Sequence, residues 1–247
     1  MIGIESVDGV AIARLEHGKV NVMDLEFCQE IAKVLPTLAG ERAVVLTGAG
    51  RAFSAGVDLK RMLDGGAEYV AAFLPALSDA FQAVFDLPNP VVAAVNGHAI
   101  AGGAILAAAA DHRLMSAGTI GVPEIFVGVP FPASPYEIVN WALGPVAGRR
   151  AILTGAVHGP DQAVAHGLAD ETSTPESLLD TALARASVLA SVSPDTFAHT
   201  KRQLRAEASA RIAAARATGE PEVLALWTAA ATDGRIHAYM EKAIGAR

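Results

Sequence analysis

Two glycine-containing turns are the segments of this sequence whose residue types and spacing predict chemistry. Ala55-Gly56 and Gly102-Gly103 each follow a short apolar run and each precede a stretch with helical spacing. Small residues at such turns let a ligand approach the backbone, whose N–H groups then become the binding atoms. Gly102 also begins a predicted helix, where the first N–H groups lack intrahelical partners and the helix carries about +0.5 of a charge. Two N–H groups that converge from these turns would form an oxyanion hole for a carbonyl oxygen.

Glu124 is the candidate acid–base residue. It follows Pro123 and has apolar neighbours in the sequence, which are Ile120, Val122, Ile125, Phe126 and Val127. Burial among such residues raises the pKa of a carboxyl group, and a raised pKa suits proton transfer near neutral pH. The alternative interpretation is structural. The two turns are then ordinary strand-to-helix connections, and Glu124 is a partly exposed residue bonded to a backbone amide.

The surrounding pattern predicts the elements that position these residues. Segments 2–7 and 10–15 flank Asp8-Gly9, which is typical of a β-hairpin. Apolar runs at 43–47 and 91–95 predict strands that are buried on both faces. Helical spacing follows Asp24 and recurs near 58–64, 67–86 and 103–110, and from about residue 134 the pattern predicts helices alone. Strands that alternate with helices predict a mainly parallel sheet with right-handed crossovers.

Composition excludes several classes of protein. The 247 residues include 26 acidic and 19 basic side chains, a formal net charge of −7, which argues against bulk attraction to nucleic acid. Cys28 is the single cysteine, so neither an intrachain disulfide nor a Cys-rich zinc site can form. The seven histidines lack close ligand spacing, so no metal site is predicted. The N-terminus lacks the pattern of a signal peptide, and we expect a cytoplasmic protein.

Two further patterns are weak matches to other functions. Residues 91–110 approach the length of a membrane span, but Asn96, His98 and three glycines interrupt them, which favours a buried strand, a turn and a buried helix. Gly48-x-Gly50-x-x-Phe53 resembles part of a dinucleotide-binding fingerprint. It lacks the third glycine, and helical spacing resumes only near Asp58.

Four segments together resemble the enoyl-CoA hydratase/isomerase, or crotonase, superfamily. They are HGKVNVMD, LTGAGRAFSAGVDL (46–59), PVVAAVNGHAIAGGAILAAAADHRL (90–114) and GVPEIFVGVPF (121–131), and the resemblance spans about residues 2–200. It implies an α/β fold, a crotonase-like spiral of ββα units. The core domain would be residues 1–190, and residues 191–247 would be a helical C-terminal trimerisation region. It also implies a homotrimer, or a hexamer formed by two trimers.

The resemblance implies a substrate and a set of site residues. The substrate would be an acyl-CoA thioester, so coenzyme A is part of the substrate and no separate cofactor is expected. Its carbonyl oxygen would lie between the N–H groups of Ala55 and Gly102, and its adenine would lie near the loop at 51–55. The expected substrate-binding residues are Arg51, Phe53, Ser54, His98, Ile105 and Phe131.

One departure from the family pattern points to the reaction. Hydratases of the family carry a glutamate two residues after the second glycine pair, where this chain has Ile105, whereas the second family glutamate is matched by Glu124. Hydration needs a water that two carboxylates hold, whereas one carboxyl group can move a proton from C2 to C4. The departure therefore favours a Δ3-Δ2-enoyl-CoA isomerase.

The alternatives are a weak hydratase, in which His98 is the nearest other titrating group, and a non-catalytic acyl-CoA-binding protein. Residues 129–134 contain no acid, which argues against dehalogenation and carbon–carbon bond chemistry.

Overall fold

A six-stranded sheet forms the centre of the protein, whose computed structural model describes residues 1–245. Its strand order is β1-β2-β3-β5-β7-β10, and every neighbouring pair is parallel except the β1–β2 hairpin. The strands are β1 (Ile2–Val7), β2 (Val10–Leu15), β3 (Ala43–Gly48), β5 (Val91–Val95), β7 (His112–Met115) and β10 (Glu171–Thr172). The predicted hairpin and the predicted buried strands are confirmed.

A smaller sheet stands beside the large one, in the order β4-β6-β8-β9. Its strands are β4 (Ala52–Ser54), β6 (His98–Ile100), β8 (Ile120–Gly121) and β9 (Val157–His158). The pairs β4–β6 and β6–β8 are parallel, and β9 is antiparallel to β8. This sheet carries the turns of interest, because the chain leaves β4 just before Ala55-Gly56 and leaves β6 just before Gly102-Gly103.

The chain advances as a spiral of ββα units. Each unit adds one strand to the large sheet, one to the small sheet and then a helix: β3-β4-α2, β5-β6-α3 and β7-β8-α4. The helices are α2 (Leu59–Phe85), α3 (Gly102–Ala108) and α4 (Glu124–Val127). Helix α2 is kinked at Gly66, whose φ is +55°, so the two predicted stretches form one bent helix. The three helix starts therefore lie at corresponding positions of the spiral.

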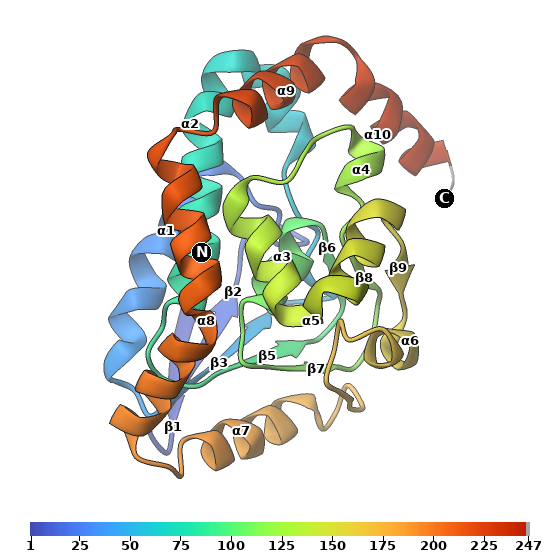
Figure 1. Cartoon of the computed structure of the whole chain (residues 1–247). Helices are drawn as coiled ribbons and strands as arrows, with labels where there is room; N and C mark the ends of the chain where they lie inside the picture. Colours follow the sequence, from blue (N-terminus) through green and yellow to red (C-terminus); the bar gives the residue numbers. More distant parts are fainter. Residues whose placement is uncertain (246–247) are drawn as a thin grey trace.

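The remaining helices surround the sheets (Figure 1). They are α1 (Leu25–Val34), the 3₁₀ helix η1 (Leu35–Gly40), α5 (Ala133–Thr154), α6 (Pro160–Ala165), α7 (Leu178–Leu189), α8 (Pro194–Ala217), α9 (Pro221–Thr232) and α10 (Arg235–Gly245). The prediction that only helices follow residue 134 was wrong, because β9 and β10 add two-residue strands to the sheets. Such short strands give almost no alternation in the sequence.

The large sheet separates two hydrophobic clusters. In β3, Val44 and Leu46 face the main core, whereas Ala43 and Val45 face the smaller cluster under α7. This explains the continuous apolar run, because a strand covered on both faces needs no polar alternation. The stretch 91–110 contains the expected buried strand, β5, and the expected buried helix, α3, but the expected turn between them includes a further strand, β6. Among the helices of residues 1–245, none has both the length and the apolar character that a membrane span requires.

A buried ionic cluster attaches α8 to the core. The Asp111 carboxylate accepts from Lys201 at 2.6 Å and from Arg205 at 2.7 Å, and the Lys201 ammonium also donates to the Asn89 carbonyl at 3.0 Å. The Arg205 guanidinium lies 4.2 Å from the centre of the Phe85 ring. Lys201 is thus a buried residue that joins α8 to the core.

Candidate active site

The first glycine turn is held by the segment that precedes α1. The Ala55 N–H donates to the Val20 carbonyl at 2.9 Å, the Met23 N–H donates to the Gly56 carbonyl at 2.8 Å, and the Asp58 N–H donates to the Met23 carbonyl at 3.0 Å. The Ala55 amide is therefore occupied and directed into the protein. The prediction that Ala55 supplies an oxyanion-hole donor does not agree with this geometry.

Val57 carries the amide of this turn that faces the opposite way. No cis peptide bond occurs in residues 1–245, so the Val57 N–H points away from the Gly56 carbonyl that Met23 holds. No atom of the described chain accepts a hydrogen bond from this N–H. Val57 therefore replaces Ala55 as the candidate donor. The sequence did not reveal it, because the contact with Met23 joins segments that are 34 residues apart.

The second turn presents the amide at the start of α3. Ala101 has a φ of +52°, and its N–H donates to the Gly121 carbonyl at 2.8 Å. Gly102 is the first residue of the helix, where no intrahelical carbonyl is available to its N–H. Within residues 1–245, this N–H has no hydrogen-bond acceptor.

The two turns are in contact, and only glycine fits between them. A Cβ on Gly102 would lie 2.8 Å from the Met23 Sδ and 3.9 Å from the Gly56 Cα. A Cβ on Gly56 would lie 2.4 Å from the Ile100 carbonyl oxygen. The two turns therefore lie against each other, which makes the Val57 and Gly102 amides the candidate pair of donors for an anionic oxygen.

Glu124 is buried at the start of α4, with a relative exposure of 7%. Burial raises the pKa of its carboxyl group to about 8, and hydrogen bonding by its own backbone amide opposes the shift. Its Oε2 atom is buried and has no hydrogen-bond partner in the described chain. Gly121, which lies three residues before Glu124, accepts a hydrogen bond from the Ala101 N–H, so the segment that leads to Glu124 is attached to the second turn.

The apolar neighbours of Glu124 are fewer than the sequence suggested. Ile120, Val122 and Val127 are buried, but Ile125 and Phe126 are exposed. The difference arises because the segment forms a helical turn, which directs successive side chains to different sides.

The C-terminal helix α10 packs against α4, the helix that begins at Glu124 (Figure 1). Arg235 donates to the Gly128 carbonyl at the end of α4 at 3.2 Å, and Ile236 is fully buried in the main core. Tyr239 packs against the same core, and burial together with the charge of Glu124 raises the pKa of its phenol. Tyr239 was not predicted, since it is 115 residues from Glu124 and belongs to no motif.

The other predicted substrate-binding residues fall into two groups. Ile105 lies one helical turn after Gly102 and is 3% exposed, so an apolar side chain occupies the position after the second turn. Phe131 is partly buried against the main core, and Arg51 is exposed in the loop before β4. His98 is exposed, and its ring bonds Thr119 at 3.1 Å.

Phe53 and Ser54 do not face a ligand. Phe53 is fully buried in the main core. Ser54 is also fully buried; its hydroxyl donates to the Asn21 carbonyl at 2.7 Å and accepts from the Gly56 N–H at 3.2 Å. Contrary to the expectation, neither side chain is accessible to a substrate, because all three residues of β4 are buried and only the backbone of the following turn is accessible.

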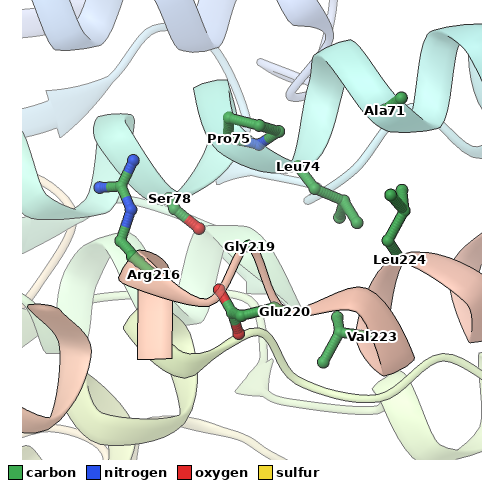
Figure 2. Close-up of a pocket in the computed structure, with 9 residues that line it drawn as sticks. All are labelled: Ala71, Leu74, Pro75, Ser78, Arg216, Gly219, Glu220, Val223 and Leu224. Atoms are coloured by element: carbon green, nitrogen blue, oxygen red, sulfur yellow. The ribbon is translucent and has the colours of Figure 1, made fainter. Parts of the chain in front are cut away.

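A separate hollow of about 150 Å³ lies between α2 and the α8–α9 connection (Figure 2). Its lining residues are Ala71, Leu74, Pro75, Ser78, Arg216, Gly219, Glu220, Val223 and Leu224, and none of these is a predicted site residue. Glu220 already accepts the Ala133 N–H at 2.6 Å. Within residues 1–245, no group of three or more His, Cys, Asp or Glu side chains is placed to hold a metal ion.

Comparisons with known proteins agree with this fold. The family model described as enoyl-CoA hydratase/isomerase matches residues 5–244. A putative enoyl-CoA hydratase of Thermus thermophilus is 39% identical over 171 residues, which are 68% of this chain and 67% of that protein. The crystal structure of the probable enoyl-CoA hydratase EchA3 from Mycobacterium tuberculosis superposes with a TM-score of 0.83 at 29% identity, covering 90% of this chain and 95% of that one.

The crystal structure of human mitochondrial Δ3-Δ2-enoyl-CoA isomerase has the same fold. It superposes with a TM-score of 0.92 at 24% identity and covers 100% of this chain and 99% of that one. The fold is therefore the crotonase fold, which members of an acyl-CoA-processing class of enzymes share. The chain belongs to the enoyl-CoA hydratase/isomerase family.

Proposed function

We propose that this protein is a Δ3-Δ2-enoyl-CoA isomerase that uses Glu124 as its single proton-transferring group. The observation that carries the proposal is the contrast between two positions. Glu124 is buried with an unpartnered oxygen and a raised pKa, whereas the position after the second turn is occupied by buried Ile105. One carboxyl group among apolar side chains can transfer a proton between two carbons of the substrate. It is poorly suited to binding the water molecule that hydration requires.

The reaction would begin with the thioester oxygen between the Val57 and Gly102 N–H groups. The Glu124 carboxylate removes a proton from C2, and the electron pair moves into the thioester carbonyl to give an enolate. The two amides stabilise the negative oxygen, and each such donor is worth about 10²–10³ in rate. The enolate then reforms the carbonyl, the double bond moves from C3–C4 to C2–C3, and C4 takes the proton from Glu124.

The dry surroundings of Glu124 support this path over hydration. A proton held by a buried carboxyl group is returned to the substrate before it exchanges with solvent, and exclusion of water protects the enolate. Hydration needs a water next to C3, and the Ile105 side chain offers it no hydrogen bond. Nothing beyond the acyl-CoA and these residues is required, so we propose that the enzyme uses no separate cofactor.

Hydratase activity is the second candidate, because the relative at 39% identity is described as a putative enoyl-CoA hydratase. The two are separated by offering the purified protein a 3-enoyl-CoA and a 2-enoyl-CoA, with Glu124→Gln in parallel. Isomerisation of the first, lost in the variant, supports the proposal. Full activity of the variant would remove Glu124 from the mechanism.

Two other results of these assays would favour a different function. Efficient hydration of the 2-enoyl-CoA by the unaltered protein supports the hydratase. Tight binding of CoA esters without turnover of either substrate supports a binding protein.

A further inference from the structure

We propose that Asn21 and Ser54 are positioning residues that fix the direction of the Val57 N–H. The proposal rests on the proposed function for its catalytic meaning, because Val57 matters to the reaction only as an oxyanion-hole donor. Neither side chain touches the substrate in this scheme. Both act through the backbone of the first glycine turn.

Asn21 joins the segment before α1 to the loop around β4. It is 1% exposed and has a φ of +51°, a conformation that asparagine tolerates better than most residues. Its side-chain nitrogen donates to the carbonyls of Ala52 and Phe53, both at 3.1 Å, and more weakly to that of Ala49 at 3.4 Å. Its side-chain oxygen accepts the His17 N–H at 2.8 Å. The side chain is thus fully used, and it sets the distance between the two segments.

Ser54 continues this connection into the turn. Its hydroxyl donates to the Asn21 carbonyl at 2.7 Å and accepts the Gly56 N–H at 3.2 Å. A Cβ on Gly103 would lie 2.3 Å from the Ser54 carbonyl oxygen, so the second turn presses directly on this residue. The Ser54 hydroxyl therefore bonds Asn21 on one side and the first glycine turn on the other.

Gly56 is consequently fixed on both sides. Ser54 holds its N–H, and Met23 holds its carbonyl at 2.8 Å. Glycine with a φ of +81° has little intrinsic resistance to rotation, so these bonds decide the orientation of the Gly56–Val57 peptide. A rotated peptide would direct a carbonyl instead of an N–H at the substrate oxygen, and one donor of the hole would be lost.

The test compares Ser54→Ala with Thr47→Val. Thr47 is a matched control, because its buried hydroxyl donates to the Ala94 carbonyl at 2.8 Å on β3, away from the turn. We expect similar small losses of thermal stability from both substitutions. Ser54→Ala should lower kcat for the 3-enoyl-CoA by about 10-fold to 10²-fold, with little change in KM. The upper value corresponds to the complete loss of one oxyanion-hole donor. Thr47→Val should leave both constants unchanged.

A spectroscopic readout reports on the hole directly. A conjugated aryl-enoyl-CoA ester absorbs at longer wavelength when its thioester carbonyl accepts hydrogen bonds. The bound ester should show a smaller shift in Ser54→Ala than in the unaltered protein or in Thr47→Val. Equal shifts and equal kcat values in the two variants would overturn the positioning role.

A third measurement separates this inference from the proposed function. Amide hydrogen exchange at Gly56 and Val57 needs no substrate, and it should be faster in Ser54→Ala than in Thr47→Val. If the unaltered protein neither turns over nor binds the CoA ester, the proposed function fails, and the exchange rates still decide whether Ser54 holds the turn. Unchanged exchange would contradict the proposal. If Ser54→Ala does not fold, Asn21→Gly takes its place in the comparison with Thr47→Val. This substitution keeps the backbone carbonyl that Ser54 bonds, and glycine adopts the positive φ.

Discussion

At the scale of single residues, the proposed chemistry depends on a carboxyl group whose charge the fold disfavours. Burial is the largest cause of the raised pKa of Glu124, and the backbone amide at the start of α4 offsets it only in part. The group is therefore protonated in much of the enzyme at neutral pH. Since the first step needs the carboxylate, a minority form of the enzyme begins the reaction.

This property predicts a pH dependence of activity. We expect kcat/KM for a 3-enoyl-CoA to rise with pH through about 8 and then to level, because Glu124 must lose its proton to act as a base. A pH–rate profile of the free enzyme measures this. A midpoint near the ordinary glutamate value would contradict the buried environment.

The same shift predicts a pH dependence of stability. The folded protein holds the Glu124 proton up to about pH 8, whereas the unfolded chain releases it near 4.5. The folded state therefore loses stability relative to the unfolded state as pH rises between these values. Chemical denaturation at several pH values measures the free energy of unfolding. Across this window, it should fall with rising pH in the unaltered protein by more than in Glu124→Gln. The same pH dependence in both proteins would be inconsistent with the shift.

Ile105 is the second residue whose identity sets the reaction. Ile105→Glu should create measurable hydration of a 2-enoyl-CoA, because a second carboxyl group would then hold water near C3. The substitution buries a charge at a 3% exposed position, so we also expect a loss of stability. Ile105→Gln is the control, with a similar shape and no acid function. Hydration at the same rate in both variants would show that the missing acid is not the difference.

At the scale of elements, buried charges attach α8 to the core, and we expect their removal to lower the free energy of unfolding. Asp111→Asn leaves Lys201 and Arg205 without a full counter-charge, and breaking such a buried network costs about 3–5 kcal/mol. Asp79→Asn is the control, because Asp79 pairs with Arg216 at the surface, where a pair contributes at most about 1 kcal/mol. Chemical denaturation measures both, and equal losses would contradict the ranking.

We expect helix α10 to contribute to the burial of Glu124, because it packs against α4, which begins at Glu124. Tyr239→Ala should open the contact between α10 and α4, admit water and lower the pKa of Glu124, since burial is the main cause of its shift. The midpoint of the pH–rate profile would then move to lower pH. Tyr239→Phe keeps the ring and should leave the midpoint nearly in place. An unchanged midpoint in Tyr239→Ala would show that α10 does not exclude water from the site.

At the scale of the whole molecule, exposed apolar side chains on α5 and α8 lead to a prediction of self-association. Val146 and Leu153 on α5 and Leu204 on α8 are each more than 60% exposed. We propose a homotrimer, or a hexamer of two trimers, that buries part of this surface. Light scattering should give a mass of three or six times 25.4 kDa, and Leu204→Asp should reduce it. Val7→Asp, on the edge strand β1, is the control. A monomer at micromolar concentration would contradict the proposal.

Much of the fold could be predicted from local patterns. The hairpin at Asp8-Gly9, the helix after Asp24 and the apolar runs of β3 and β5 depend on neighbouring residues, and each of these predicted elements is present. The two-residue strands β9 and β10 could not be predicted, because they exist only through pairing with distant strands.

The candidate site divides in the same way. The residue types at Gly102, Ile105 and Glu124 belong to contiguous motifs, so the sequence alone identified two small-residue turns, one acid and an apolar residue where a second acid would stand. The tertiary structure decided which amide of the first turn is free, because the choice between Ala55 and Val57 depends on hydrogen bonds to the segment before α1. It also decided that α10 packs against α4, the helix that begins at Glu124. A sequence shows which groups are present, but the direction of a peptide N–H and the burial of a carboxyl group are set by contacts between segments far apart in the chain.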